Sequence, residues 1–508
     1  MKTMTFAVMF ILATAGWARA LCMTPGRCVA AVDTPRVQSI DSLLRKLHDD
    51  AGFDGNVLVA DGGKVIYQKS FGPALTENSL FGLASVSKIF TAVAIMQLAE
   101  QGQLNLSTSI YQYFPNLPYK DITVWHLLTH TSGLEDYLAD PVRSALKTDN
   151  PSNADVEEAY AFTHPKTRFY PDSDWSYSNT NYLLLAMIVE KVSGESFPHY
   201  VRNHIFDPAG MSHSFVLKKN IPKRFQKDIV TPLYYPDYFA LRPMSVDSIP
   251  FTRMYYSLVE NIYGDGEVFS TAGDLFRFFR ALKDGRLLQE ETLRQMYTPT
   301  AIIGSNDYEA GNANPDYASW YGIGWIVARD ISNGRVVWHS GANPGTLTFF
   351  MQNVRNGRCV VVLNNNWYRG SFHLGGSLMN ILADKPVQLL PPSLARRVGQ
   401  YYTRYGADSA IALLDRLKNG KDYHIGLSEM NELGYGLLGR GDTRTAIAVL
   451  KVNADKYPES ADVWDSLAEA YYKAGNKVEA INDYQRSIDL NPGNENGLRM
   501  LEKIKRAE

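Results

Sequence analysis

A serine and a lysine three positions apart, Ser85 and Lys88, are the first residues whose types and spacing suit covalent chemistry. Side chains three apart on a helix share a face, so the lysine amine can reach the serine hydroxyl. A serine hydroxyl becomes a good nucleophile when a base removes its proton, and a lysine serves as that base where burial or nearby cations lower the pKa of its amine. The pair predicts a serine nucleophile.

Two further motifs follow in the chain, and their order supports this interpretation. Tyr177-Ser178-Asn179 offers a phenol as a second candidate base, and His339-Ser340-Gly341 stands at the end of a predicted late strand. Two similar motifs compete with them. Ser144-Ala145-Leu146-Lys147 lies in a polar stretch without apolar periodicity, and no paired strands follow His373-Leu374-Gly375. Ser85 and His339 are therefore preferred.

The elements that must position these residues can be read from periodicity. Apolar residues recur at helical spacing over 85–101, and Gly102 stands where that helix would stop. The runs 56–60 and 64–69 flank a turn signal and predict a hairpin. Further helices are predicted at 181–192 and 272–283, and late strands at 322–328, 335–338, 346–351 and 359–363. The Tyr- and Pro-rich stretch 228–263 predicts no element and is a candidate wall of a pocket.

The end of the chain repeats itself. Three pairs of identical residues recur at an interval of 34: Gly441 and Gly475, Ala446 and Ala480, and Pro458 and Pro492. This is the tetratricopeptide period, and 461–494 resembles that family's signature, with a degenerate earlier unit at 401–417 as a stacking neighbour. The fold class predicted is α+β: an antiparallel sheet flanked by helices with a helical subdomain, followed by an all-α repeat domain.

Bulk properties define the class of protein and its organisation. A chain of 508 residues is longer than one hydrophobic core usually supports. Its composition, 45% hydrophobic and 20% charged, is that of an ordinary globular protein. The net charge of -2 excludes a nucleic acid partner. We expect three parts: a signal peptide at 1–20, a hydrolase domain at 35–390 and repeats at 395–508.

The first residues predict export. Lys2, a short apolar stretch and Ala18-Arg19-Ala20 are typical of a cleaved signal peptide, which implies a periplasmic or extracellular location in a bacterium and no membrane span after cleavage. A retained anchor is the alternative, although the apolar run is short for a spanning helix. Cys22 and Cys28 can close a small loop or stay unpaired, and Cys359 lies in an apolar run.

Taken in order, these motifs resemble the serine β-lactamase and penicillin-binding-protein superfamily over 56–382, in its class C β-lactamase, D,D-carboxypeptidase, D-aminopeptidase and esterase branch. The segments 127–134 and 266–274 are similar to segments common in that branch. The resemblance implies an acyl-Ser85 intermediate and no cofactor or metal. It also implies that Lys88 and Tyr177 exchange the protons, either of them being the base.

The same resemblance implies how substrate is bound. Asn179 would hold Lys88 and a substrate amide, and the backbone N–H groups of Ser85 and Ala342 would form the oxyanion hole. His339, Ser340 and Gly341 would line the substrate strand. β-Lactamases usually carry Lys at the position of His339, so this departure favours ester, D-amino-acid amide or peptide substrates over efficient β-lactam hydrolysis, and a Lys there should raise the β-lactam rate.

Alternatives stay open at this point. A sensor that is acylated at Ser85 without turnover would keep the same motifs, as would a scaffold whose repeats bind a protein partner. His126 and His130 are four residues apart and could bind a metal, but the Glu of a zinc-protease helix is missing and a packing role is favoured. The expected partner of the catalytic domain is a small-molecule or peptide substrate.

Overall fold

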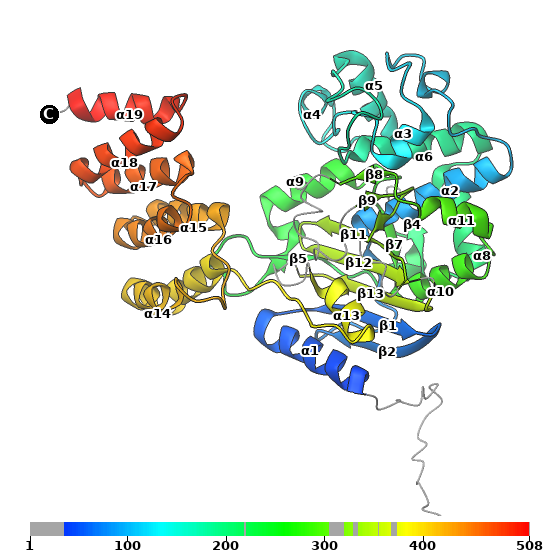
Figure 1. Cartoon of the computed structure of the whole chain (residues 1–508), viewed down its shortest axis with the longest axis horizontal. Helices are drawn as coiled ribbons and strands as arrows, with labels where there is room; N and C mark the ends of the chain where they lie inside the picture. Colours follow the sequence, from blue (N-terminus) through cyan, green and yellow to red (C-terminus); the bar gives the residue numbers. More distant parts are fainter. Residues whose placement is uncertain are drawn as a thin grey trace, which may run out of the picture.

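The computed structural model describes residues 35–217, 220–303, 320–328, 334–353, 355–366 and 373–506. The predicted signal peptide, Cys22 and Cys28 lie outside these residues. The described chain forms a sheet with helices on both faces, a helical subdomain above one edge, and a series of helices that extends away from the sheet at the C-terminal end (Figure 1). This is the α+β class predicted, followed by helical repeats.

The main sheet has eight strands, each antiparallel to its neighbours. In spatial order they are β2 (Lys64–Phe71), β1 (Gly55–Asp61), β13 (Arg358–Asn364), β12 (Thr346–Asn353), β11 (Val336–Asn343), β10 (Ile326–Val327), β9 (Trp320–Tyr321) and β8 (Ala301–Ile302). The first hairpin is joined by sequence-distant strands, with Val57 opposite Val362. Strand β11 is longer than predicted and contains the His339-Ser340-Gly341 motif instead of ending at it.

The strand predicted at 322–328 is a hairpin instead. Strands β9 and β10 pair with Ile326 opposite Tyr321, so the residues between them form its turn. Gly324 takes a φ of +74°, and a Cβ there would lie 2.5 Å from the Cβ of Ala92. Close approach to the central helix, which only glycine permits, ends the strand where alternation alone had predicted continuity.

Two cores lie on opposite faces of the sheet, and alternation along β13 assigns its residues to them. Cys359 and Val361 join the core with α2 (Lys88–Glu100) and α10 (Ala272–Lys283), whereas Val360 packs with α1 (Pro35–Ala51) and α13 (Leu374–Leu382). Helix α2 is buried along nearly its whole length, as its apolar periodicity predicted, and the 3-10 turn η1 (Ala84–Ser87) precedes it.

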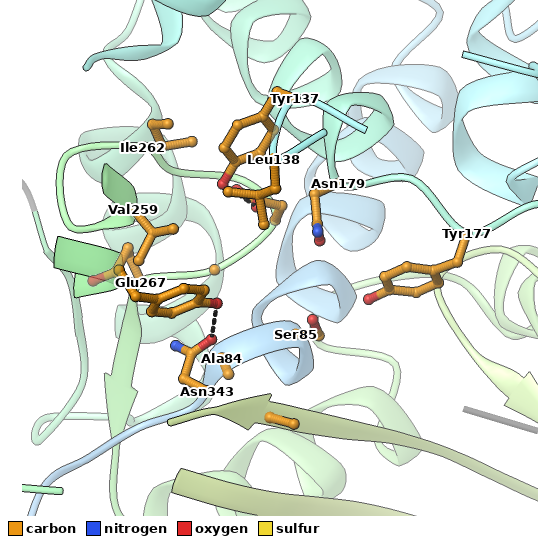
Figure 2. Close-up of a pocket in the computed structure, with 14 residues that line it drawn as sticks. Ala84, Ser85, Tyr137, Leu138, Tyr177, Asn179, Val259, Ile262, Glu267 and Asn343 are labelled. Atoms are coloured by element: carbon orange, nitrogen blue, oxygen red, sulfur yellow. Dashed lines mark hydrogen bonds between the residues drawn. The ribbon is translucent and has the colours of Figure 1, made fainter. Parts of the chain in front are cut away.

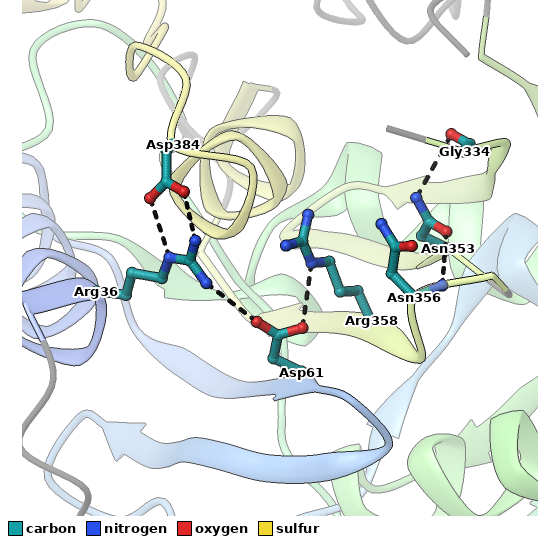
Figure 3. Close-up of polar contacts among 7 residues, drawn as sticks. All are labelled: Arg36, Asp61, Gly334, Asn353, Asn356, Arg358 and Asp384. Carbon is teal, nitrogen blue, oxygen red and sulfur yellow. Dashed lines mark hydrogen bonds and ion pairs between the residues drawn. The ribbon is translucent and has the colours of Figure 1, made fainter. Parts of the chain in front are cut away.

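Helix α1 is tied to the sheet by charged side chains (Figure 3). Arg36 pairs with Asp384, which follows α13, and lies 3.3 Å from Asp61 of β1. Arg358 of β13 donates to the other oxygen of Asp61 at 3.1 Å. These partly exposed pairs add little stability each, but they link the start of the described chain to β1, β13 and the segment after α13.

The helical subdomain is formed by the part of the chain that follows α2. It consists of η2 (Ile110–Gln112), α3 (Val124–Thr129), α4 (Val142–Ala145), α5 (Asn153–Thr163) and α6 (Asn179–Ser193). The next elements return toward the sheet: α7 (Phe197–Val201), the π-helical turn η3 (Arg202–Phe206), α8 (Asp207–Ala209), η4 (Lys223–Phe225) and α11 (Glu290–Met296). A small sheet of β3 (Phe81–Gly82), β7 (Val268–Ser270) and β4 (Phe215–Val216) supports η1.

The stretch 228–263, for which the sequence predicted no element, contains three short ones and a helix. They are β5 (Leu233–Tyr234), β6 (Met244–Ser245), η5 (Val246–Ser248) and α9 (Pro250–Val259). Helix α9 begins at a proline, which suits a first helical turn because its missing N–H has no partner there.

The C-terminal helices form the predicted pairs. They are α14 (Leu394–Leu417, broken at Gly406), α15 (Leu427–Gly439), α16 (Thr443–Lys456), α17 (Ala461–Lys473), α18 (Lys477–Leu490) and α19 (Glu495–Arg506). Gly441 and Gly475 take φ values of +79° and +81° between paired helices, where glycine is favoured. None of the described helices combines the length and apolar composition that crossing a bilayer requires.

The repeats are joined to the rest of the chain through the segment before α9. Phe239 is buried in the same core cluster as α14 and α15. The Thr403 hydroxyl donates to the Phe239 carbonyl oxygen at 2.9 Å, and Arg440 pairs with Asp237 at 3.1 Å. The first repeat helices therefore contact the segment that leads into α9.

Candidate active site

Ser85 lies in the turn η1, where this turn meets strand β11. The strand passes so close that a Cβ added to Gly341 would lie 2.0 Å from the Leu83 carbonyl oxygen and 3.0 Å from the Ser85 nitrogen. Ala84 has a φ of 47°, in the left-handed region that residues other than glycine rarely take. Glycine at 341 thus lets the backbone of Ser85 lie directly against the strand, while the serine side chain stays partly exposed.

Lys88, one turn further on, is fully buried at 0% exposure. Its Nζ lies 3.0 Å from Ser85 Oγ, 2.7 Å from Asn179 Oδ1 and 2.9 Å from the Asp265 carbonyl oxygen. The last two atoms only accept hydrogen bonds, so they take two of the amine's hydrogens. The Ser85 hydroxyl lies at a third position around the Lys88 nitrogen.

Two residues of the segment before α6 fix the Tyr177-Ser178-Asn179 motif. The carboxylate of Asp136 accepts the backbone N–H of Asn179 at 2.8 Å and its Nδ2 at 2.9 Å, which turns Oδ1 toward Lys88. Burial raises the pKa of Asp136. His130 accepts the Ser178 N–H at Nδ1 over 3.2 Å. Hydrogen bonds to the Asp136 carboxylate and to the His130 ring therefore hold the motif in place.

Tyr177 brings its phenol to the same place. Its ring packs on that of His130 with centroids 4.4 Å apart, and Lys88 Nζ lies 4.9 Å from its centroid. Figure 2 shows the phenol pointing toward the Ser85 hydroxyl. Burial, with a smaller contribution from the charge of Lys88, holds the pKa of His130 well below its usual value. The ring therefore stays neutral and serves as packing and as an acceptor.

The two histidines considered as metal ligands both have structural roles. His126 Nδ1 accepts the Thr123 N–H at the start of α3, completing a capping box, and His130 supports the tyrosine motif as described. Both side chains thus make contacts of the kind that the sequence analysis favoured, packing or hydrogen bonding. Within the described residues, no group of three or more metal-binding side chains is present.

His339 does not occupy the position that the sequence predicted for a substrate-binding residue. Its ring is fully buried and does not line the pocket at Ser85. Nε2 lies 3.1 Å from the Tyr321 hydroxyl and Nδ1 lies 2.6 Å from the Ser340 carbonyl oxygen. Burial lowers the pKa of His339 to about 3, so the ring is neutral, donates from Nδ1 and accepts at Nε2. It packs behind Tyr177 with centroids 6.2 Å apart.

A cavity of about 260 Å³ opens beside Ser85. Its lining consists of Ala84, Ser85, Tyr137, Leu138, Tyr177, Asn179, Tyr255, Val259, Ile262, Asp265, Gly266, Glu267, Ala342 and Asn343. Figure 2 shows Tyr177 on one side of Ser85 and Tyr137, Leu138 and Glu267 on the other. The Tyr- and Pro-rich stretch does wall the pocket: Tyr255, Val259 and Ile262 belong to its lining, and the Tyr255 hydroxyl donates to Asn343 Oδ1 at 2.8 Å.

The lining is acidic. No Lys, Arg or His belongs to it among the residues that the structure describes, whereas Asp265 and Glu267 do. Burial raises the pKa of Asp265 to about 6, against the opposing charge of Lys88. Burial and the neighbouring negative charges of Asp265 and Glu260 raise the pKa of Glu267 to about 8.

The competing motifs lie elsewhere. Ser144 is exposed on α4 and its Oγ contacts Asp140, while Lys147 pairs with Glu158 instead of reaching the serine. His373 precedes α13 and is not among the residues that line the cavity at Ser85. Neither serine 144 nor this histidine approaches the pocket lining.

Sequence reasoning did not single out Asp136, Tyr137, Tyr255, Asp265 or Glu267. Two of them had a signal: the Gly266 to Asp274 segment was recognised for its similarity, and Glu267 lies inside it with Asp265 directly before. Asp136 follows the other recognised segment by two residues. Tyr255 carried no signal beyond its place in the candidate pocket wall 228–263, and Tyr137 carried none.

The fold and this site together define a class: an α+β domain with a partly exposed serine, a buried lysine and a tyrosine at one acidic pocket. The family model described as Beta-lactamase matches residues 40–380, and the chain belongs to this family of serine hydrolases. A tetratricopeptide repeat model matches residues 461–494, over α17 and α18.

Among curated proteins, the chain is 33% identical over 340 residues to penicillin-binding protein 4* of Bacillus subtilis, covering 64% of this chain and 71% of the relative. It is 28% identical over 349 residues to putative penicillin-binding protein PbpX of the same organism, covering 66% of this chain and 78% of the relative.

Solved structures share the fold. The octameric penicillin-binding protein homologue from Pyrococcus abyssi has a TM-score of 0.57 at 24% identity, over 69% of this chain and 78% of its own. D-amino acid amidase from Ochrobactrum anthropi SV3, complexed with L-phenylalanine amide, has a TM-score of 0.55 at 21% identity, over 69% and 98%.

Proposed function

We propose that the chain is an exported serine hydrolase that cleaves an ester or a D-amino-acid amide or peptide through an acyl-Ser85 intermediate. The observation that carries the proposal is the position of Lys88. Its Nζ lies 3.0 Å from Ser85 Oγ, while Asn179 and the Asp265 carbonyl oxygen take two of its hydrogens. A neutral amine so held directs its lone pair at the serine hydroxyl, the arrangement that a general base needs.

Acylation uses the groups around the pocket. Ser85 Oγ bonds to the substrate carbonyl carbon and its proton passes to Lys88 Nζ. The negative oxygen of the tetrahedral intermediate accepts hydrogen bonds from the backbone N–H groups of Ser85 and Ala342, two residues that line the same cavity. The bond to the leaving group then breaks, and that group takes a proton from Lys88 through the phenol of Tyr177.

Deacylation reverses these roles. Water attacks the acyl carbon, Tyr177 and Lys88 take up its proton, and the released Ser85 Oγ regains one, so the enzyme returns to its starting state. Asn179 holds Lys88 in place between steps and offers its amide to the substrate. The neutral, buried His339 acts as a positioning residue behind Tyr177 in this scheme.

The pocket favours these substrates over β-lactams. β-Lactam antibiotics carry a carboxylate, and the described lining contains no cationic side chain to bind it. A structural neighbour at 21% identity is a D-amino acid amidase, which adds weight to amides of D-amino acids.

The test is hydrolysis of p-nitrophenyl acetate by the mature chain and two matched variants. We expect Ser85→Ala to abolish turnover and Ser144→Ala, at the exposed motif of the same pattern, to leave kcat/KM unchanged. Equal activity of both variants would refute the assignment. A single stoichiometric release of nitrophenol without turnover would instead identify an acylated sensor.

Export and partner binding complete the proposal. The predicted signal peptide supports a periplasmic or extracellular location, as do curated relatives that are bacterial penicillin-binding proteins. The matched tetratricopeptide repeat supports a protein-binding role for the C-terminal helices, since such helix pairs stack into recognition surfaces. The identity of that partner is a separate question from the hydrolase activity.

A further inference from the structure

A second cavity, the α14 cleft, opens where the end of α1 meets the first repeat helix (Figure 1). Its volume of about 500 Å³ lies within the range of roughly 300–1,000 Å³ that is common for ligand sites. The lining comes mainly from the end of α1, the segment after β5 and the first turns of α14, and it shares no residue with the lining of the cavity at Ser85. The α14 cleft is therefore a separate site.

The walls of the α14 cleft are held together by backbone contacts. A Cβ added to Gly399 would lie 2.4 Å from the Tyr238 carbonyl oxygen, so α14 packs directly against the segment after β5. At the end of α1, the Gly52 carbonyl oxygen accepts a hydrogen bond from Asn366 Nδ2 at 2.9 Å. The cleft is thus built into the contact between the catalytic domain and the first repeat helix.

The first turns of α14 supply three cations to the cleft, Arg396, Arg397 and Arg404. Arg397 and Arg404 are seven residues apart, which places them on one face of the helix two turns apart. Within the part of the chain that the structure describes, none of the three side chains forms an ion pair or donates a hydrogen bond. Arg440 and Arg444, by contrast, each pair with an aspartate. The positive charge of the cleft is not neutralised by α14 or its neighbours.

Tyrosine rings hold two of these guanidinium groups. The Cζ atom of Arg396 lies 4.3 Å from the centre of the Tyr235 ring, and its Nη1 is buried without a hydrogen-bond partner among the described residues. The Cζ atom of Arg397 lies 5.9 Å from the centre of the Tyr401 ring, which packs on Tyr405 with centroids 4.5 Å apart. A cation–π contact orders a guanidinium group and leaves its charge in place.

The opposite rim of the cleft carries two acids, Asp49 and Asp50, at the end of α1. Asp50 pairs with Lys46 of the same helix at 2.5 Å, so its charge is already balanced. Neither acid forms an ion pair with the arginines of α14 in the described structure. The lining therefore has positive charge in excess, which favours an anionic ligand.

We propose that the α14 cleft binds an acidic peptide segment of a partner protein. A guanidinium group donates two parallel hydrogen bonds to a carboxylate, and arginine and tyrosine are enriched at the residues that dominate protein-protein binding. The inference rests on the proposed partner-binding role of the C-terminal helices and gives that role a location. Helix α14 lies outside the matched repeat at 461–494, so the site is distinct from a surface formed by that repeat.

The experiment is fluorescence anisotropy with the full mature chain at low ionic strength. The probes are fluorescein-labelled peptides of six glutamates and of six glutamines, which match in length and differ in charge. We expect the glutamate peptide to bind at least about tenfold more tightly, and Arg397→Gln combined with Arg404→Gln to reduce this preference to about threefold or less. The control, Arg416→Gln combined with Arg499→Gln, removes two exposed arginines outside the lining and should keep the preference.

Three results would overturn the inference. The first is equal binding of the two peptides by the wild type. The second is a preference that persists in the cleft variant, which would place the peptide elsewhere and leave a partner-binding role for the repeats intact. The third is binding of phosphatidylglycerol vesicles with no binding of the glutamate peptide, which would make the ligand a membrane surface. Both arginines of the cleft variant are exposed, so its melting temperature should match that of the wild type. No turnover is measured, so the outcome is independent of the hydrolase proposal.

Discussion

Replacing Glu267 by Gln should stabilise the protein increasingly as pH rises. Burial and neighbouring negative charges raise the pKa of Glu267 from 4.5 to about 8 in the folded chain. Between these values the folded state holds a proton that the unfolded state has released, so the stability of the wild type falls with increasing pH. Gln has the shape of the protonated acid and does not titrate.

The size of the effect follows from the same shift. Over the interval from pH 5 to pH 7 the unfolded acid is mostly ionised and the folded one mostly protonated, which costs the wild type about 2–3 kcal/mol. The group is 8% exposed, so solvent screening reduces this figure little. The unfolding free energy of Glu267→Gln should therefore exceed that of the wild type by about 2–3 kcal/mol more at pH 7 than at pH 5.

Urea unfolding followed by tryptophan fluorescence at pH 5, 6, 7 and 8 measures this difference. The matched control is Glu77→Gln, an exposed acid of the same domain, which should follow the wild type at every pH. Parallel pH profiles of the wild type and Glu267→Gln would show that the folded and unfolded chains titrate this acid alike, and the reasoning about its burial would be wrong.

Three further predictions concern other parts of the molecule. Tyr177→Phe should lower kcat for p-nitrophenyl acetate about 10²–10⁴-fold with an unchanged melting temperature, and a kcat within threefold of wild type would remove the phenol from the proton path. His339→Lys should lower the unfolding free energy by about 3 kcal/mol or more in urea titrations, because it buries a charge near Lys88, and should not raise the cephalosporin rate as the sequence had suggested. Phe239→Ala should destabilise the contact between the segment before α9 and the first repeat helices by about 3 kcal/mol, measured as faster hydrogen exchange in α14. Tyr405→Ala, at an exposed position, should not change this exchange. Equal exchange rates in the two variants would contradict the packing argument.

Local pattern was enough to predict much of the framework. The buried helix after Ser85, the first hairpin, the late strands at 335–338, 346–351 and 359–363 and the 34-residue repeat were read correctly, because helices and strands impose periods of 3.6 and 2 on apolar residues. The strand predicted at 322–328 failed where Gly324 packs against Ala92, a contact between residues distant in sequence.

The sequence by itself determined the order of the motifs, the preference for Ser85 over Ser144 and the class of chemistry, since each depends on residue types at short spacing. Only the tertiary structure decided what surrounds them. It buried His339 away from the pocket, turned Asn179 toward Lys88 through Asp136, and placed Asp265 and Glu267 in the lining of the cavity at Ser85. Burial and charge proximity depend on segments that meet only when the chain folds, and these two quantities shift the pKa values of Asp265, Glu267 and His339.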